Sequence, residues 1–401
     1  MKSFPDVFAA EPIPESAKAE INEILGSGDL FRYTAGAQSP VSKLEKEFAE
    51  YMGVSYALAV SSCSSALFLS LKALDLKPRS KVLIPAFTFA AVPSAIVHAD
   101  CTPVLVNVGD NYRIGLNDFE QKLTDDVAAV MISHMRGHTS NMDEILKLCG
   151  ERNIPVIEDA AHSLGATWSR RKIGTMGLIG CFSFQSYKLI NAGEGGMFVT
   201  GDPDIIARAI LMSGAYEHNW KKHPVVSDRF AYWQNKLPLY NMRMNNLSAA
   251  VLRPQIREIS QRAKKGRANH DYAASILNAS QWLHVPPPLD FERRAPDSIQ
   301  FNLCGFDTDD ETLAFQRRAR EKGVEVQIIG LSKDNARAFW NWKFIGPQGD
   351  LSQTRNMLMR ACDVRLPARL ERNALDVIAA ALVDAAEEVK SDSRLQQKAA
   401  V

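Results

Sequence analysis

Lys188 and Asp159 are the residues whose surroundings most clearly suggest chemistry. Lys188 follows the apolar run Gly180–Phe184 and precedes the sequence Gly193-Glu194-Gly195-Gly196. A lysine held at the mouth of a sheet loses solvation, which lowers the pKa of its amine and favours a Schiff base with an aldehyde. Asp159 lies 29 positions earlier, just after the apolar run Ile154–Ile157. A carboxylate there needs a positive partner, and a protonated pyridine nitrogen is one.

A serine-rich loop provides a candidate phosphate site. Ser61-Ser62-Cys63-Ser64-Ser65 lies between a predicted strand and a predicted helix, where backbone N–H groups and hydroxyls favour an anion. Ser183 could donate to the same phosphate, and the glycines after Lys188 allow close approach of the backbone to a cofactor. Phe89 is a candidate for stacking on a planar ring. Together these residues suggest pyridoxal phosphate (PLP).

Each of these features also has a purely structural interpretation. Asp159 suits the N-cap of a helix, and the serines suit an ordinary helix cap. Lys188 could be a solvated residue of a hairpin turn, and a single phenylalanine such as Phe89 is more often part of a core. The separation of Asp159 from Lys188 and the glycines that follow favour the cofactor site.

The elements that would position these residues alternate between short β-rich runs and helical stretches up to about residue 212. This alternation predicts an α/β sandwich with a mostly parallel sheet, and such sheets present ligand sites at their strand ends. The predicted strands are Tyr56–Val60, Val82–Ile84, Pro103–Val106, Ala128–Ile132, Pro155–Glu158, Gly180–Phe184 and Met197–Thr200.

The 401 residues suit two domains. We expect a large cofactor-binding domain over 1–245 and a helical connection with a smaller α/β domain over 246–401. The first domain includes a helix capped by Ser39 and ended by Gly53, and a long ordered loop at 214–240. The connection should be helical from Asn246 to about Leu277, with a bend at Pro254.

Composition excludes several classes of partner. Forty-seven basic and forty-six acidic residues nearly cancel, so we expect no nucleic acid and no membrane. The six cysteines are widely spaced without a C-x-x-C pair, which argues against disulfides and a metal site and suits a reducing cytoplasm. The first residues do not form a signal peptide, and no apolar stretch is long enough to span a bilayer.

Four ordered motifs resemble the DegT/DnrJ/StrS family of PLP-dependent sugar aminotransferases, which have the aspartate aminotransferase fold. The resemblance covers about Ser39 to Arg253 and recurs weakly at Leu366-Pro367. The family pattern E-D-x-A-(Q/H)-x-x-G-A matches Glu158–Ala166, and S-F-x-x-x-K followed by G-E-G-G matches Ser183–Gly196. P-x-x-T-(F/W) matches Pro85–Phe89, and Y-N-x-R-M matches Tyr240–Met244.

The resemblance implies a role for each matching residue. Lys188 would form the Schiff base and shuttle the proton, and Asp159 would pair with the pyridine nitrogen. The remaining cofactor contacts would be stacking by Phe89, a contact from His162 beside the phenolic oxygen, and phosphate contacts from Ser64, Ser65 and Ser183. Asn241 would reach the phosphate of a neighbouring subunit, which implies a homodimer with shared active sites.

Lysine at position 188 also favours transamination over the dehydratase branch of the family, which has histidine there. Glutamate or glutamine is the expected amino donor, and the acceptor would be a keto or aldehyde group of a sugar or sugar-like acid, in amino-sugar or secondary-metabolite biosynthesis. Candidate substrate contacts are His134, Arg136 and Arg243. Arg136 could bind a carboxylate bidentately. The late sugar-nucleotide signature of the family is replaced by Asn335–Phe344.

Three alternatives remain open from the sequence. The same scaffold could support a PLP-dependent decarboxylase, oxidase or cyclase. A metal hydrolase could use His134 and His138, four residues apart, with Asp159 and His162, although Gly137 disfavours the helix that would align the first pair. A sensor or regulator without catalysis is disfavoured by the intact set of Lys188, Asp159 and Ser183.

Overall fold

The computed structural model describes residues 4–35, 38–223 and 228–399, with side chains described as far as residue 392. Its largest element is a seven-stranded sheet that contains all seven predicted strands. Their order across the sheet is β1 (Tyr56–Val60), β9 (Gly196–Thr200), β8 (Ile179–Ser183), β5 (Val156–Asp159), β4 (Val127–Ser133), β2 (Lys81–Pro85) and β3 (Thr102–Val106). The α/β fold with a mostly parallel sheet is therefore confirmed.

The pairing brings the carboxyl ends of the central strands to one edge of the sheet. β8, β5, β4, β2 and β3 pair in parallel, and β9 pairs antiparallel with both β8 and β1. Ser133, the last residue of β4, is in register with Asp159, the last residue of β5. Polar residues that follow these strands consequently meet at one place.

Alternating side chains give the sheet two buried faces. Along β1, Ala57 and Ala59 pack into one core cluster, while Leu58 and Val60 pack into another, as the two-residue period of a strand requires. The first cluster includes α2 (Pro40–Met52), α6 (Met142–Gly150) and α9 (Asn246–Leu252). The second includes α3 (Cys63–Ala73), α4 (Ala91–His98) and α7 (Pro203–Met212).

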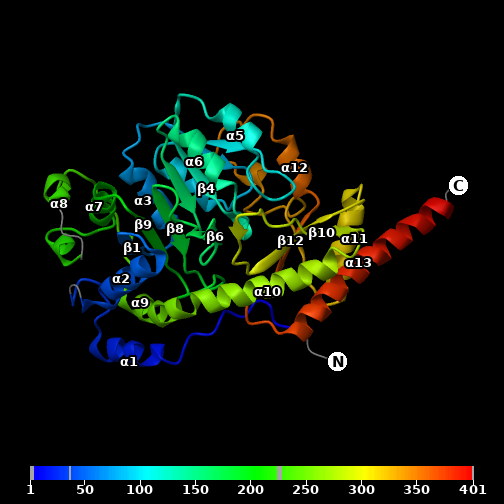
Figure 1. Cartoon of the computed structure of the whole chain (residues 1–401), viewed down its shortest axis with the longest axis horizontal. Helices are drawn as coiled ribbons and strands as arrows, with labels where there is room; N and C mark the ends of the chain where they lie inside the picture. Colours follow the sequence, from blue (N-terminus) through cyan, green and yellow to red (C-terminus); the bar gives the residue numbers. More distant parts are fainter. Residues whose placement is uncertain (1–3, 36–37, 224–227, 400–401) are drawn as a thin grey trace.

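A second, antiparallel sheet lies in the C-terminal part of the chain. Its order is β10 (Leu283–His284), β12 (Ser298–Leu303), β14 (Ala361–Arg365) and β13 (Gln327–Ile328). Helices α11 (Asp309–Glu321) and α13 (Arg372–Ala399) share its core. The long helix α10 (Ile259–Leu277) runs from the large sheet to this second one (Figure 1). A domain boundary after residue 245 stays a prediction.

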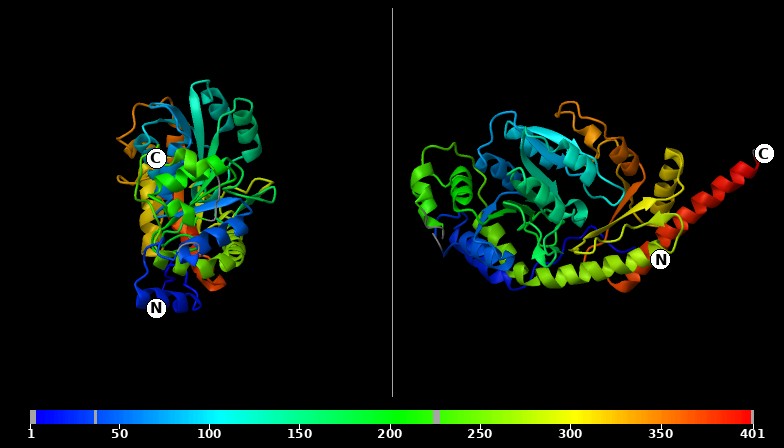
Figure 2. Two further views of the ribbon diagram at one scale, coloured as in Figure 1. Left: turned by 90° about the vertical axis from the view of Figure 1, so that its left-hand side faces the viewer. Right: turned by 45° about the horizontal axis from the view of Figure 1, so that its top comes forward.

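Two other local predictions can be compared with the structure. Ser39 accepts a hydrogen bond from the backbone N–H of Ser42, and Gly53 ends the helix in a left-handed conformation, φ 75°. The region 214–240 contains the short helices η3 (Asn219–Lys222) and α8 (Arg229–Trp233), and Pro224, which the predicted loop includes, lies outside the described residues. Helix α8 and α13 lie at opposite ends of the molecule (Figure 2).

The segment 6–12 connects the two sheets without being a strand of either. Arg262 and Asn191 donate to the carbonyls of Pro12 and Glu11, at 2.7 and 3.3 Å. Residues of the smaller part bind the same segment: Arg365 donates to Val7, and Arg369 donates to Asp6 and Ala9. We call residues 6–12 the N-terminal strap.

Candidate functional site

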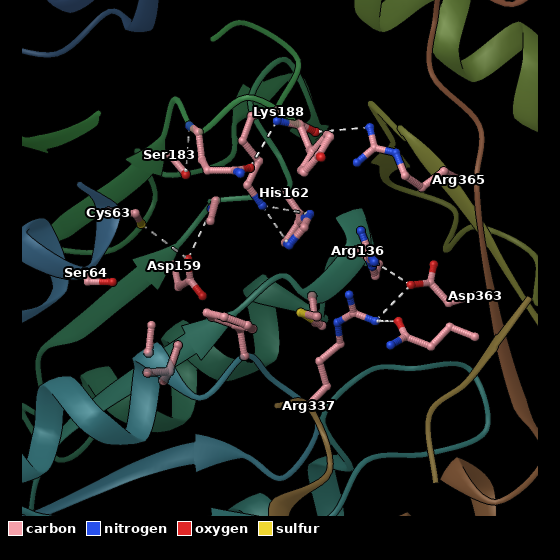
Figure 3. A pocket seen from close by; sticks show the side chains of 18 of the residues that line it. Cys63, Ser64, Arg136, Asp159, His162, Ser183, Lys188, Arg337, Asp363 and Arg365 are labelled. Atoms are coloured by element: carbon pink, nitrogen blue, oxygen red, sulfur yellow. Dashed lines mark hydrogen bonds and ion pairs between the residues drawn. The ribbon is translucent and has the colours of Figure 1, made fainter. Parts of the chain in front are cut away.

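A cavity of about 980 Å³ opens at the carboxyl end of the large sheet. Its size is that of a typical site for a cofactor together with a small substrate. Seven of the residues proposed from the sequence line it: Ser64, Phe89, Arg136, Asp159, His162, Ser183 and Lys188. These residues are far apart in the sequence but come together because parallel strands deliver their ends to one edge (Figure 3).

Asp159 faces the cavity while its neighbour Glu158 does not. The Asp159 carboxylate accepts from the Ser133 hydroxyl at 2.7 Å and from the Ala161 backbone N–H at 3.1 Å. Glu158 points to the other side of β5, where it accepts from the backbone N–H groups of Gly174, Met176 and Gly177. Residues 160–165 form turns and no helix. Asp159 is therefore not a helix cap, and it remains able to pair with a cation in the cavity.

Lys188 lies in the connection between β8 and β9, and its partly buried side chain lines the cavity. The Nζ atom is 2.9 Å from Nε2 of His162. Burial lowers the pKa of Lys188 to about 8, although Asp297 and Asp159 act in the opposite direction. Burial also holds the pKa of His162 well below its ordinary value, and the charge of Lys188 lowers it further. The amine is therefore closer to its nucleophilic, neutral form than a solvated lysine.

The first turn of α3 forms another wall of the cavity. Ser62 is the N-cap and accepts from the backbone N–H of Ser65 at 3.1 Å. Ser64 lines the cavity, whereas Ser65 is buried and bonds to the hydroxyls of Ser61 and Ser62. A side chain at Gly196 would meet the backbone of Ser62 at 2.3 Å. This glycine is required because β9 packs directly against the serine loop.

Besides Ser65, three predicted site residues do not line the cavity of their own chain. His134 is fully buried and bonds to Glu158, with Nε2 and Oε2 3.2 Å apart. Arg243 donates to the Gly214 carbonyl at 2.8 Å and lies over the rings of Phe31 and Tyr216. Asn241 is exposed.

The side of the cavity away from Asp159 contains, beside the predicted Arg136, charged residues that the sequence did not single out. Arg136 and Arg337 both donate to the buried carboxylate of Asp363, the latter at 3.0 Å. Arg365 also lines the cavity, beside Tyr187. Figure 3 shows these residues on the other side of Lys188 and His162 from Asp159. The only sequence signal was that Arg337 lies in the segment that replaces the sugar-nucleotide signature.

The geometry gives little support to a metal site. His134 bonds to Glu158, and His138 bonds to Gln300 at 2.9 Å. Gly137 between them is part of the 3₁₀ turn η2 (Met135–Gly137), not of an α-helix. Within residues 4–35, 38–223 and 228–399, no group of three His, Cys, Asp or Glu side chains is arranged to hold a metal ion. No helix in these ranges is long and apolar enough to cross a membrane.

The donor set fits PLP. The Asp159 carboxylate suits a protonated ring nitrogen, the Lys188 amine suits the aldehyde, and the N-terminus of α3 with Ser64 and Ser183 suits the phosphate. The cavity also retains space beyond these three groups, on the side of Arg136. The site can therefore hold the cofactor and a second small molecule at the same time.

Comparison with known proteins gives a consistent result. The model of the DegT/DnrJ/EryC1/StrS aminotransferase family matches residues 13–383. GDP-perosamine synthase of Escherichia coli O157:H7 is 32% identical over 268 residues, which are 67% of this chain and 70% of that protein. The 3-amino-5-hydroxybenzoate synthase of Amycolatopsis mediterranei is 30% identical over 331 residues, 82% of this chain and 83% of the relative.

Solved structures share the fold over nearly the whole chain. The crystal structure of 3-amino-5-hydroxybenzoic acid synthase has a TM-score of 0.82 and 25% identity, and the match covers 96% of this chain and all of that one. A GDP-4-keto-6-deoxymannose-3-dehydratase with a trapped PLP-glutamate geminal diamine has a TM-score of 0.81 and 21% identity, covering 95% and 100% of the two chains.

Proposed function

We propose that Lys188 and Asp159 are the catalytic residues of an enzyme acting on sugars or sugar-like acids. The basis is that this chain belongs to the DegT/DnrJ/EryC1/StrS aminotransferase family. The chain is a PLP-dependent aminotransferase. It takes an amino group from glutamate or glutamine and transfers it to a keto or aldehyde group in amino-sugar or secondary-metabolite biosynthesis. The relatives named after GDP-perosamine and UDP-linked amino sugars support this class of acceptor.

Each residue has a defined task in this proposal. Bound PLP supplies an electron sink for the transfer of the amino group. Asp159, held by Ser133, keeps the ring nitrogen protonated. Lys188 tethers the cofactor and afterwards moves a proton between its Nζ atom and the substrate carbon. Phe89 and His162 orient the ring, and Ser64 and Ser183 hold the phosphate. The Ser65 hydroxyl, also expected there from the sequence, is buried against Ser61 and Ser62 and does not line the cavity.

One observation supports these roles more than any other: the Lys188 amine, with its lowered pKa, and the Asp159 carboxylate line a single cavity that also has a helix N-terminus in its wall. The direct test is to incubate the yellow protein with glutamate or glutamine and follow the visible spectrum. We expect conversion to the pyridoxamine form with one of these donors. A spectrum that no amino acid changes would contradict transamination and favour another PLP-dependent reaction.

We also propose that the protein works in the cytoplasm and that it forms a homodimer with shared active sites. The dimer is supported by the position of Asn241, which is exposed and does not line the cavity of its own chain. Large apolar side chains lie exposed in the neighbouring segments, including Leu30, Phe31 and Leu239. Exposed apolar groups of this kind are typical of a surface that another subunit covers.

The shared site can be tested by mixing two inactive variants. Lys188→Ala removes the amine on one chain, and Asn241→Ala removes the proposed phosphate contact on the other. A mixed dimer regains one intact site, so we expect recovered activity after the two proteins are denatured and refolded together. Each variant refolded alone is the control. Mixtures that stay as inactive as the controls, despite forming dimers, would argue against sharing.

A further inference from the structure

The positive end of the cavity is formed by segments from both sheets. Arg136 lies in the turn after β4 and has a left-handed backbone conformation, φ 55°. Asp363 belongs to β14. Arg337 lies in the loop between β13 and α12 (Ser352–Leu358), which is fixed to the large domain by a hydrogen bond from Ala90 to Ala336 and a bridge between Phe87 and Ala338.

This cluster has one positive charge more than its own carboxylate can balance. Arg136 and Arg337 contribute two positive charges, and Asp363 between them contributes one negative charge. Arg365, the next arginine, has Asp297 as its acidic neighbour. Arg136 and Asp363 are only 7% and 5% exposed. A buried charge without a partner is costly, so the arrangement favours an anion with a single charge.

The guanidinium groups also have free donors. Nε of Arg136 is buried and has no hydrogen-bond partner among the described residues. Arg337 uses Nη1 for its bonds to both Gln327 and Asp363. Its Nε and Nη2 make no hydrogen bond within the described part of the chain, and they are available to a ligand. Burial and, after it, the charge of Arg136 together lower the pKa of Arg337 to about 10, which is consistent with an excess of positive charge.

We propose that Arg136 and Arg337, held together by Asp363, form a subsite for a carboxylate of both substrates, so that the acceptor is a carboxylated ketone or aldehyde rather than a nucleotide-linked sugar. This proposal rests on the proposed function. Donor and acceptor occupy the same space in turn, and the donor is an amino acid that has a carboxylate. Planar, forked donors match the two oxygens of a carboxylate.

The position of the cluster relative to Lys188 supports this assignment. A substrate that replaces the Lys188 amine at the cofactor aldehyde must extend away from Asp159, because Asp159 binds the opposite end of the ring. That direction leads toward Arg136, Arg337 and Asp363 (Figure 3). The subsite therefore lies on the side of the cavity into which a substrate bound at the cofactor aldehyde would extend.

Calorimetric titration of the PLP-loaded enzyme with unreactive probes tests the subsite without turnover. We expect cyclohexanecarboxylate to bind at least about tenfold more tightly than the neutral cyclohexanecarboxamide. Arg337→Gln should abolish this difference, and Arg337→Lys, which keeps the charge but not the fork, should retain part of it. Arg320→Gln is the matched control, since Arg320 borders the same cavity but is exposed and paired with Glu325 at 3.1 Å.

Two outcomes would overturn the proposal. One is carboxylate binding that Arg337→Gln leaves unchanged while the variant still binds PLP and unfolds at the parental temperature. The other is uridine diphosphate binding that exceeds carboxylate binding and is lost in Arg337→Gln, which would assign the subsite to a diphosphate. Failure of the proposed function is separate, because it would appear as an unchanged visible spectrum when the parent enzyme meets glutamate or glutamine.

Discussion

At the Asp159 end of the cavity, the side chains come from neighbouring strand ends of one sheet, whereas at the Arg136 end they come from three segments of the chain. Ser133 and Asp159 are adjacent because β4 and β5 pair in register. Arg136 and Asp363 are 227 positions apart, one in the turn after β4 of the large sheet and the other in β14 of the smaller sheet. The first end is defined by a single sheet, and the second depends on how two sheets are placed relative to each other.

This difference separates two properties of the enzyme. In the proposed mechanism, the chemistry depends on Asp159 at the end of β5 and on Lys188 in the connection that follows β8, both belonging to the large sheet. In the proposed subsite, substrate choice depends on Arg337, which lies in the loop between β13 and α12. Substitutions at the first end should therefore change kcat, and those at the second should mainly change KM.

The largest effect is expected for Lys188→Ala. Turnover should fall at least about a thousandfold, because both the tether and the proton shuttle are lost. Borohydride followed by mass spectrometry of the intact chain should attach the cofactor to the parent and not to the variant. A variant that is still labelled by borohydride would mean that another lysine forms the imine.

Asp159→Asn should reduce kcat by about a hundredfold or more, because a neutral amide cannot keep the ring nitrogen protonated. The variant should still fold, since the amide oxygen can accept from the Ala161 backbone N–H while the NH2 group donates to the Ser133 hydroxyl. Steady-state kinetics measures kcat, and thermal unfolding shows whether the variant is folded. Near-parental kcat in a folded variant would remove Asp159 from the catalytic residues.

A smaller effect, about tenfold, is expected when pH is varied during cofactor uptake. The pKa of Lys188 is lowered to about 8, so its amine is mostly protonated at pH 7 and mostly neutral at pH 9. The rate at which cofactor-free protein forms its imine should rise about tenfold over this range and then level off. Stopped-flow absorbance measures the rate. A rise that continues to pH 10 would indicate an ordinary, solvated lysine.

The smallest effect is expected for Gln300→Leu. This substitution tests the Arg136 end of the cavity at a residue that does not line the cavity. Gln300 donates to Asp363 at 2.8 Å and accepts from His138 at 2.9 Å. Its loss should lower the free energy of unfolding by about 1–3 kcal/mol and raise KM for the amino donor a few-fold, with little change in kcat. A lower kcat with an unchanged KM would show that the two ends are not separable in this way.

The sequence was informative wherever local pattern determines structure. Alternation and apolar runs predicted the strands of the large sheet, and the Ser39 cap and Gly53 end of α2 followed from local backbone chemistry. Asp159 and Lys188 were predicted as a pair because each follows such a strand. Arg337 and Asp363 could not be predicted in the same way, because their proximity depends on long-range packing between the sheets that leaves no periodic signal.

The N-terminal strap has a practical consequence for handling the protein. It offers backbone carbonyls to Arg262 on one side and to Arg365 and Arg369 on the other, so it acts as a tether across the two sheets. Phe8 of the same segment lines the cavity. Removing these residues, or attaching a bulky fusion next to them, would loosen the contact between the sheets and open the side of the cavity, so affinity tags belong elsewhere on the chain.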